Sequence, residues 1–207
     1  MDLHILETPG EIKMTKATRK QGPKRSEESR AAILEATREE LAENGWRKFS
    51  VDGVAKRAHA SKQTIYRWWD SVGTMCVDAG LELLPPQGKL GRDPLERVTD
   101  IFLPLELACR AGHGHAVLRA SLIAAADDQQ AGEYWRQWMN DTLRAPLRNL
   151  LAELTAKRIV RRDWDIDTAV QVMLGAFWHR LVFTRAPIAE GHMATQARLL
   201  LDMFAPE

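Results

Sequence analysis

Residues 50–69 read SVDGVAKRAHASKQTIYRWW, and this stretch decides the fold. Its first half predicts a short helix that Ser50 caps, because apolar residues recur at helical spacing from Val51 to Ala58. After a turn at His59-Ala60, Ser61 caps a second helix whose inward side holds Ile65 and Trp69. Two short capped helices joined by a tight turn form a helix-turn-helix pattern.

The outward side of the second helix carries side chains that can contact DNA. Lys62 can donate to guanine O6 or N7, and Gln63 can pair with the adenine edge. Side chains around them can reach phosphates or extend this surface: Ser50, Ser61, Thr64, Tyr66 and Arg67. The spacing alone also fits an amphipathic surface helix with no role in binding, so this alternative stays open.

Charge is distributed unevenly along a chain whose formal net charge is only +1. Residues 13–25 contain no acidic side chain and hold six basic ones: Lys13, Lys16, Arg19, Lys20, Lys24 and Arg25. With few apolar residues and a Gly22-Pro23 break, residues 1–25 are interpreted as a disordered basic arm. Such an arm can neutralise phosphates, so Lys24 and Arg25 are candidate DNA contacts, although a solvated tail is the simpler alternative.

Composition narrows the class of protein. The chain has 207 residues, of which 45% are hydrophobic and 28% charged, as in a folded globular protein. Cys76 and Cys109 cannot make a disulfide framework, and no apolar run is long enough to span a membrane, so a cytoplasmic location is expected. The N-terminus lacks the pattern of a signal peptide.

The rest of the chain predicts further helices and no convincing strand, so the fold class is all-α. Ser26 is expected to cap the first helix, and Asn44-Gly45 to end it. A fourth helix follows Ser71 and closes at Pro85-Pro86. Beyond it, apolar periodicity predicts longer helices at about 94–111, 115–126, 128–158, 167–184 and 192–204, with kinks at Pro104 and Pro146.

The residues of the first third resemble the DNA-binding domain of the TetR (tetracycline repressor) family of bacterial transcriptional regulators. The resemblance is specific over residues 26–84 and rests on Gly45-Trp46, Ser50, Val54-Ala55, Ala58, Ser61, Thr64-Ile65-Tyr66 and Trp69. It implies base contacts by Lys62 and Gln63, phosphate contacts by Thr64 and Tyr66, and an arm that reaches a neighbouring groove. Two positions depart from the pattern: His59 replaces the turn glycine, and Val72 replaces a lysine that usually contacts phosphate.

The resemblance also implies a division of the chain: an arm over 1–25, a helix-turn-helix domain over 26–87, and an effector-binding and dimerisation domain over 88–207. Bundle interiors often hold small molecules among aromatic side chains, so candidate pocket residues are Phe102, Trp135, Trp138, Met139 and Trp178. The helix near 167–184 is apolar on nearly all sides, which predicts that it and the last helix pair across a homodimer. A larger core within one chain that buries both helices is the alternative. The interface candidates are Met173, Phe177, Leu181, Leu200 and Phe204.

Other chemistry is weakly supported by the sequence. Cys109, His113 and His115 lack a fourth metal ligand, so no metal or cofactor is expected. Both cysteines and His179 fit core packing better than catalysis. No catalytic motif supports an all-helical enzyme. The sequence therefore predicts a dimeric repressor that binds a palindromic DNA operator and is released by a small apolar or aromatic effector. An architectural protein that binds DNA with little sequence preference is the main alternative.

Overall fold

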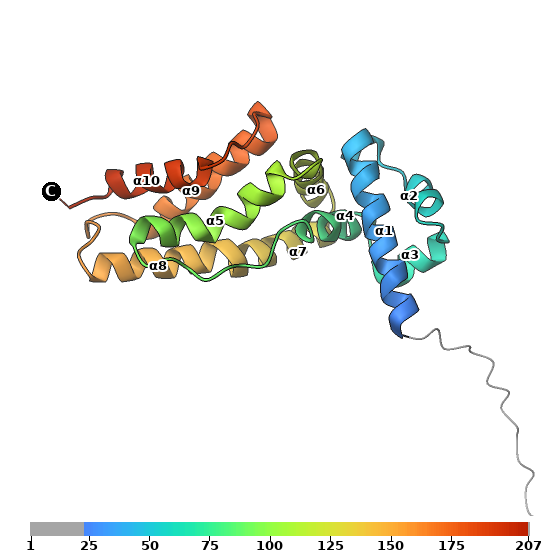
Figure 1. The fold of residues 1–207 in the computed structure, drawn as a ribbon, viewed down its shortest axis with the longest axis horizontal. Helices are drawn as coiled ribbons and strands as arrows, with labels where there is room; N and C mark the ends of the chain where they lie inside the picture. The colour runs from blue at the N-terminus through green and yellow to red at the C-terminus, as the bar shows by residue number, and fades with distance from the viewer. Residues whose placement is uncertain (1–22, 207) are drawn as a thin grey trace, which may run out of the picture.

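The computed structural model describes residues 23–206, which fold into helices with no strand in that range. The first helices are α1 (Pro23–Asn44), the short η1 (Trp46–Lys48), α2 (Val51–Arg57), α3 (Lys62–Trp68) and α4 (Val72–Leu81). Then follow α5 (Pro94–Arg110), α6 (Gly114–Asp127), α7 (Gln129–Met139), η2 (Asn140–Arg144), α8 (Ala145–Ala156), α9 (Ile166–His179), η3 (Arg180–Thr184) and α10 (His192–Met203). The molecule is elongated, with α1, α2 and α3 at one end and the C-terminus at the other (Figure 1).

The N-terminal helices surround a small core of their own. Val54 of α2 and Ile65 of α3 are fully buried against Ile33 and Leu34 of α1, and Trp69 closes the same cluster. The inward positions expected for α2 and α3 are therefore confirmed. Because the core is made by one face of each helix, the opposite face of α3 is left to solvent.

The start of α1 differs from the expectation. The helix begins at Pro23, so Ser26 lies inside it and is not its cap. Proline suits a first helical turn because its ring fixes φ and its missing N–H has no helical partner there. The last three residues of the predicted arm, Pro23–Arg25, therefore belong to α1, and residues 1–22 lie outside the described residues.

Helix α4 joins the two halves of the chain through close packing on α6. A side chain at Gly80 would come within 2.4 Å of the Ser121 hydroxyl, so this crossing requires glycine. Ser121 Oγ donates to the Cys76 carbonyl at 2.7 Å, which ties the two helices together at the same point. Ser71 caps α4, and the helix ends at Leu81, before the proline pair that was expected to close it.

Two long helices predicted in the C-terminal half are each interrupted by a π-helical turn. The 128–158 segment divides into α7, η2 and α8, with the irregular turn directly before Pro146. Proline lacks an N–H and its ring crowds the carbonyl four residues earlier, and the wider π-helical turn accommodates both effects at Pro146. At Pro104, by contrast, α5 continues as one α-helix, so no break occurs there. The 167–184 segment is α9 followed by η3, and Asp165 supplies its cap.

The largest core lies between α5, α8, α9 and α10. Phe102, Leu147 and Phe177 are among its fully buried members. Glu106 is buried beside them, and its carboxylate accepts the backbone N–H groups of Gly191 at 2.8 Å and Met193 at 2.9 Å. A carboxylate from α5 thus satisfies the start of α10, where the helix dipole favours negative charge. None of the described helices is both long and apolar enough to cross a bilayer.

Candidate nucleic-acid interface

Local capping and one unusual backbone angle position α2 and α3. Ser50 Oγ accepts the Gly53 N–H at 3.2 Å, and Ser61 Oγ accepts the Thr64 N–H at 3.1 Å. His59 adopts a φ of 49°, in the left-handed region, where the chain turns between the helices. The sequence expectation that His59 takes the conformation usually given to glycine is confirmed, since histidine tolerates this region better than most residues.

The outward face of α3 is a continuous polar surface. Lys62, Gln63, Tyr66 and Arg67 are exposed, and Thr64 is half-buried. Gln63, Thr64, Tyr66 and Arg67 line a shallow, open concavity of about 480 Å³. Figure 1 shows α3 at the end of the molecule remote from α8 and α10, so a partner as large as a duplex can reach this face.

Three of the predicted contact residues, Ser61, Lys62 and Thr64, already have intramolecular partners. Lys62 Nζ lies 2.7 Å from Asp52 Oδ1 of α2, and this hydrogen bond raises the pKa of Lys62. Ser61 and Thr64 share a hydroxyl contact of 2.9 Å in addition to the cap. Lys62 would have to leave this carboxylate before it could contact a base edge, whereas Gln63 has no such competitor among the described residues.

Arg57 is a structural residue that the sequence did not reveal. Its guanidinium reaches Glu39 at 3.4 Å and Glu40 at 3.3 Å, and it also pairs with Glu43. These three carboxylates lie on α1, so Arg57 holds α2 against α1. Gly53 permits the close approach, because a side chain there would lie 2.7 Å from Glu40 Oε2.

Comparison with known proteins identifies this arrangement. The family described as "Bacterial regulatory proteins, tetR family" matches residues 33–71, from α1 through the end of α3. The chain is 27% identical over 180 residues to the uncharacterized HTH-type transcriptional regulator YdeS of Bacillus subtilis, covering 84% of this chain and 88% of that protein. The chain belongs to the TetR family.

Further relatives agree. The DNA-binding transcriptional repressor TetR of Mycobacteroides abscessus is 47% identical over 47 residues, which cover 23% of this chain and 25% of that protein. The solved structure of the TetR-family regulator SCO0332 is 26% identical with a TM-score of 0.53, covering 86% of this chain and all of the other. Salmonella enterica GusR shares the fold, with a TM-score of 0.61 over 90% of this chain and 99% of its own. This TetR-family chain is therefore a DNA-binding transcriptional regulator rather than an enzyme.

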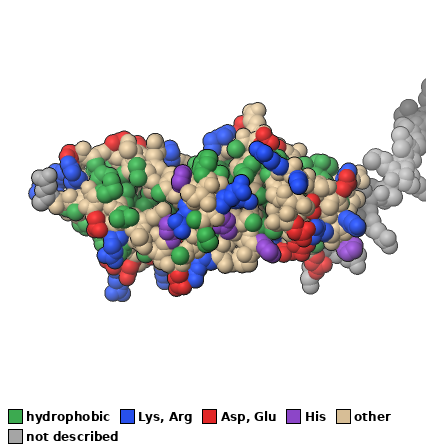
Figure 2. Space-filling model, turned by 90° about the horizontal axis from the view of Figure 1, so that it is seen from above, with side chains coloured by type: hydrophobic (Ala, Val, Ile, Leu, Met, Phe, Trp, Pro, Cys, Tyr) green, Lys and Arg blue, Asp and Glu red, His purple; other side chains and the backbone are tan. Residues whose placement is uncertain are grey.

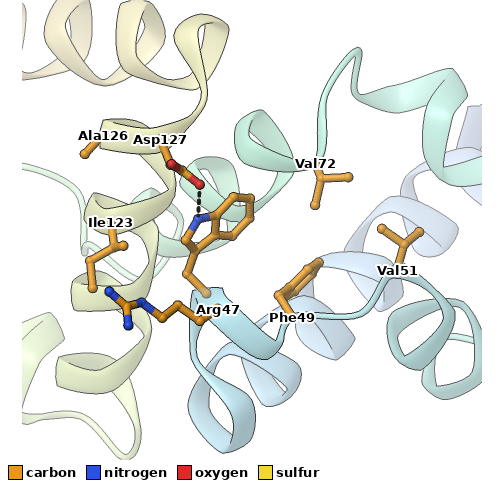
Figure 3. Close-up of a pocket in the computed structure, with 8 residues that line it drawn as sticks. Arg47, Phe49, Val51, Val72, Ile123, Ala126 and Asp127 are labelled. Carbon is orange, nitrogen blue, oxygen red and sulfur yellow. Dashed lines mark hydrogen bonds between the residues drawn. The ribbon is translucent and has the colours of Figure 1, made fainter.

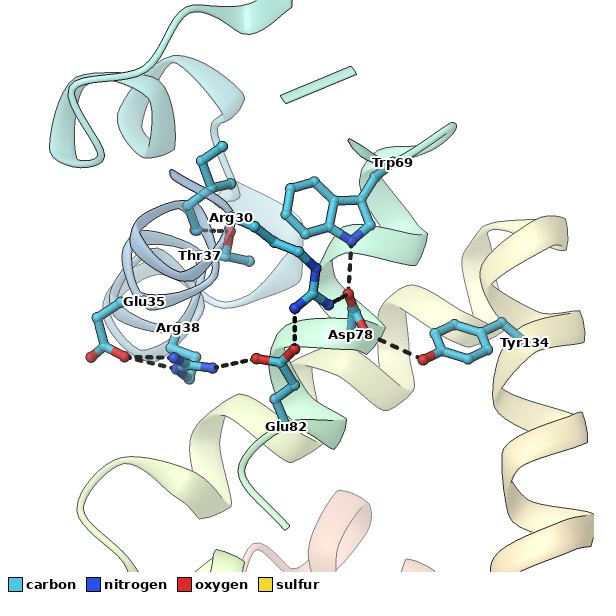
Figure 4. A network of polar contacts seen from close by, with 9 residues as sticks. Arg30, Glu35, Thr37, Arg38, Trp69, Asp78, Glu82 and Tyr134 are labelled. Atoms are coloured by element: carbon cyan, nitrogen blue, oxygen red, sulfur yellow. Dashed lines mark hydrogen bonds and ion pairs between the residues drawn. The ribbon is translucent and has the colours of Figure 1, made fainter. Parts of the chain in front are cut away.

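In this TetR-family chain, a polar network ties the DNA-binding helices to the C-terminal half (Figure 4). Asp78 of α4 accepts hydrogen bonds from Arg30 of α1 at 2.5 Å, from Trp69 Nε1 at 2.9 Å and from the Tyr134 hydroxyl of α7 at 3.2 Å. Arg30 also pairs with Glu82 at 2.6 Å. One carboxylate thus joins α1, the end of α3, α4 and α7.

A second junction between the two halves is made by Trp46 of η1 (Figure 3). Trp46 Nε1 donates to Asp127 Oδ2 of α6 at 3.0 Å. Beside this bond opens a cleft of about 620 Å³, lined by Trp46, Arg47, Phe49, Val51, Val72, Ile123, Ala126 and Asp127. Val72, the departure from the family's lysine, is half-buried here, so it packs at the junction.

The predicted pocket residues divide into two groups. Phe102 is fully buried in the largest core. Trp135, Trp138 and Trp178 gather between α7 and α9, with ring centroids 5.2 Å apart for the first pair and 5.5 Å for Trp135 and Trp178. Trp178 Nε1 is buried without a hydrogen-bond partner among the described residues. Met139 is partly buried against the largest core.

The residues chosen for a dimer interface mostly face inward. Met173, Phe177, Leu181 and Leu200 are buried in the core of their own chain, and the half-buried Phe204 packs on Trp164 in a tilted arrangement with ring centroids 4.0 Å apart. A side chain that its own chain covers cannot also make a surface contact, so the four buried residues are not available at the surface. The exposed apolar residues of the same elements are Val172, Phe183, Leu199 and Met203.

The three residues that were considered as metal ligands do not converge as a set, although Cys109 and His115 line the same cleft. Cys109 is buried, whereas His113 is exposed at the start of α6 and His115 is half-buried. Across residues 23–206, no group of three His, Cys, Asp or Glu side chains is arranged to hold a metal ion. Both cysteines are free and buried, as the sequence suggested, and burial raises the pKa of both thiols.

Proposed function

We propose that this chain is a ligand-responsive repressor that binds a palindromic operator as a homodimer and leaves it when a small effector binds. The exposed face of α3 carries the proposal. Lys62 and Gln63 at its N-terminal end would read base edges in the major groove, and Tyr66 and Arg67 would contact the flanking phosphates. Lys24, Arg25 and the preceding arm would add phosphate contacts that carry no sequence information.

Dimerisation would supply the second recognition helix. Val172 and Leu199 are 52% and 59% exposed, an unusual exposure for large aliphatic side chains on α9 and α10. Phe183 and Met203, 76% and 64% exposed, extend the same elements. Pairing these helices across a two-fold axis would cover the apolar surface and set two α3 helices about 34 Å apart, one turn of B-DNA.

Effector response would use the junctions already described. Residues 26–87 would act as the DNA-binding domain and residues 88–207 as the effector-binding and dimerisation domain. Trp135 and Trp138 lie on the same helix as Tyr134, which bonds to Asp78, and Trp178 of α9 packs against Trp135. A ligand that favours a different position of α7 would therefore shift the population toward a different orientation of α3.

The experiment that tests the proposal is to recover the genomic fragments that the purified dimer retains and to sequence them. A repressor of this type predicts a small set of sites with two-fold symmetry that survive competition with random DNA. Retention of fragments without a shared sequence would instead support an architectural role. The genes beside the recovered sites, and their transcription with and without the regulator, distinguish repression from activation.

A further inference from the structure

Cationic side chains gather on the C-terminal half, where α5, α6, η3 and α10 meet. Figure 2 shows Lys or Arg and His side chains along the middle of the face seen from above. The group consists of Arg110 of α5, His115 and Arg119 of α6, Arg180 and Arg185 at the two ends of η3, and His192 at the start of α10. It is separate from the outward face of α3 and from the tryptophans of α7 and α9.

Carboxylates do not balance this charge within the described part of the chain. Glu190 and Glu106 both approach Arg110, at 2.7 Å and 4.0 Å, and Glu106 is already engaged by the backbone of α10. Arg119, Arg180 and Arg185 form no ion pair with any described residue. Arg180 instead donates to the Pro187 carbonyl at 2.8 Å and 3.1 Å.

The cationic groups repel one another in a partly buried setting. Burial lowers the pKa of Arg119, and the charge of Arg185 lowers it further. Burial likewise lowers the pKa of His115. A backbone contact with Ala186 opposes this shift, and repulsion from Arg119 and Arg180 adds to it. Half-buried like charges disfavour their own ionised forms, so a bound anion would relieve an unfavourable arrangement.

A cleft lies within this group. It has a volume of about 360 Å³ and is lined by Cys109, Arg110, His115, Arg185, Pro187 and Ile188. His115 Nε2 is buried and has no hydrogen-bond partner among the described residues. The buried Ile188 and Cys109 supply an apolar floor, and burial raises the pKa of Cys109 to about 12, so its thiol is neutral. Arg110 and Arg185 are exposed at the rim.

We infer that this cleft binds a small organic anion, whose carboxylate or phosphate group is held by the guanidinium groups and whose apolar part rests on Ile188 and Cys109. Guanidinium groups bind oxyanions through charge-assisted hydrogen bonds, and the unpartnered imidazole nitrogen offers one more polar contact. The anion supplies the missing counter-charge between α6 and η3. Only its assignment as the effector rests on the proposed function.

Calorimetric titration of the full chain, without DNA and at constant ionic strength, tests the site directly. Hexanoate, hexyl phosphate and the neutral hexanol are the three probes. Both anions are expected to bind and hexanol is not. Arg185→Gln should weaken anion binding at least about tenfold, because Arg185 lines the cleft and the variant removes a charge-assisted contact. Arg119→Gln should weaken it by a smaller factor, because Arg119 does not line the cleft and adds only a nearby positive charge. Arg92→Gln is the matched control, since Arg92 is exposed in the loop before α5, and it should change affinity by less than about twofold.

Thermal unfolding of each variant without ligand checks that it is folded. Because Arg185 is exposed, Arg185→Gln tests anion binding without disturbing the packing around the half-buried Arg119. Absence of saturable binding by either anion would overturn the inference, as would binding unaffected by Arg185→Gln or equal binding of hexanol. If Arg185→Gln weakened operator binding in anion-free buffer, the cationic group would be a DNA contact and not an anion site.

A second measurement separates the site from the regulatory proposal. Release of the operator by hexanoate or hexyl phosphate in the wild-type chain, lost in Arg185→Gln, would identify the bound anion class as the effector's. Anion binding with unchanged operator affinity would keep the site and overturn its effector role. Failure of α3 variants to affect operator binding would contradict the proposed function while leaving the calorimetric result intact.

Discussion

The two ends of this molecule are stabilised by interactions of different range. In α2 and α3, serine caps bind amides three residues away, and the small core of Val54 and Ile65 belongs to neighbouring helices. In the C-terminal half, Glu106 binds the start of α10 from 85 residues away, and one large core joins four helices. The end that holds α2 and α3 therefore depends on a small number of buried side chains, whereas the other end is stabilised by many.

Replacing one buried aliphatic residue at each end tests this difference most strongly. Ile65→Ala and Leu147→Ala each remove a fully buried side chain and should lower the free energy of unfolding by about 2–5 kcal/mol. Only Ile65→Ala is expected to reduce operator affinity sharply at a temperature where both variants are folded, because α3 rests on Ile65. Circular dichroism melting and fluorescence anisotropy with operator DNA measure the two effects. Equal loss of DNA binding by both variants would show that the two ends unfold as one unit.

The same difference in range explains what the sequence could predict. Ser50 and Ser61 were found as caps because the amides they bind are three residues away. Ile65 and Trp69 were placed inward by helical spacing alone. Arg57, Asp78 and Glu106 were missed because their partners lie on other helices, as with Arg30 and Asp78, 48 residues apart. Apolar periodicity likewise cannot say whether Phe177 faces its own chain or another, and four of the five dimer candidates are buried in the core of their own chain.

The proposed dimer would use only the surface of the C-terminal half, so it offers the next comparison of the two ends. Leu199→Glu places a charge on an exposed apolar residue of α10 and should yield a folded monomer. Loss of the second half-site should weaken binding to a palindromic site by about 100-fold or more, through the lost effective concentration of the second α3. Light scattering gives the mass and anisotropy the affinity. Leu107→Glu on α5, also exposed, is the control and should remain dimeric.

Substitutions at Asp78 and at its partner Tyr134 test the link between the two ends. Asp78→Asn keeps the shape of the side chain but removes the charge that Arg30 pairs with, at a cost of about 1.5–3 kcal/mol in unfolding free energy. Tyr134→Phe removes only the 3.2 Å bond from α7 and should cost about 0.5–1.5 kcal/mol. If Asp78 positions α3, operator affinity should fall more in Asp78→Asn than in Tyr134→Phe. Identical operator affinity in both variants and wild type would assign the network to stability alone.

A smaller loss of operator affinity is expected when one base contact on the outward face of α3 is removed. Gln63→Ala should cost about 1–3 kcal/mol on the operator and relax the preference at one base pair, with little change on random DNA. Gln137→Ala, an exposed glutamine of α7, is the control and should bind as the wild type does. Affinity selection from a randomised operator library measures the preference. A uniform loss on operator and random DNA would make Gln63 a backbone contact.

The smallest effect is expected from the ion pair inside the recognition surface itself. Asp52 holds Lys62 at 2.7 Å in the free protein, and both side chains are largely exposed, so the pair adds little to stability. Asp52→Asn frees the ammonium group and removes a negative charge that faces the phosphates. Operator affinity should therefore rise, by less than about fivefold, because an exposed pair is weak and screened by salt. The gain should disappear in the background of Lys62→Ala if Asp52 acts through Lys62, and should persist there if Asp52 only repels the DNA backbone. Anisotropy titrations of the single and double variants at two salt concentrations distinguish these two roles of Asp52. Lower operator affinity in Asp52→Asn would mean instead that the carboxylate orients Lys62 for base contact.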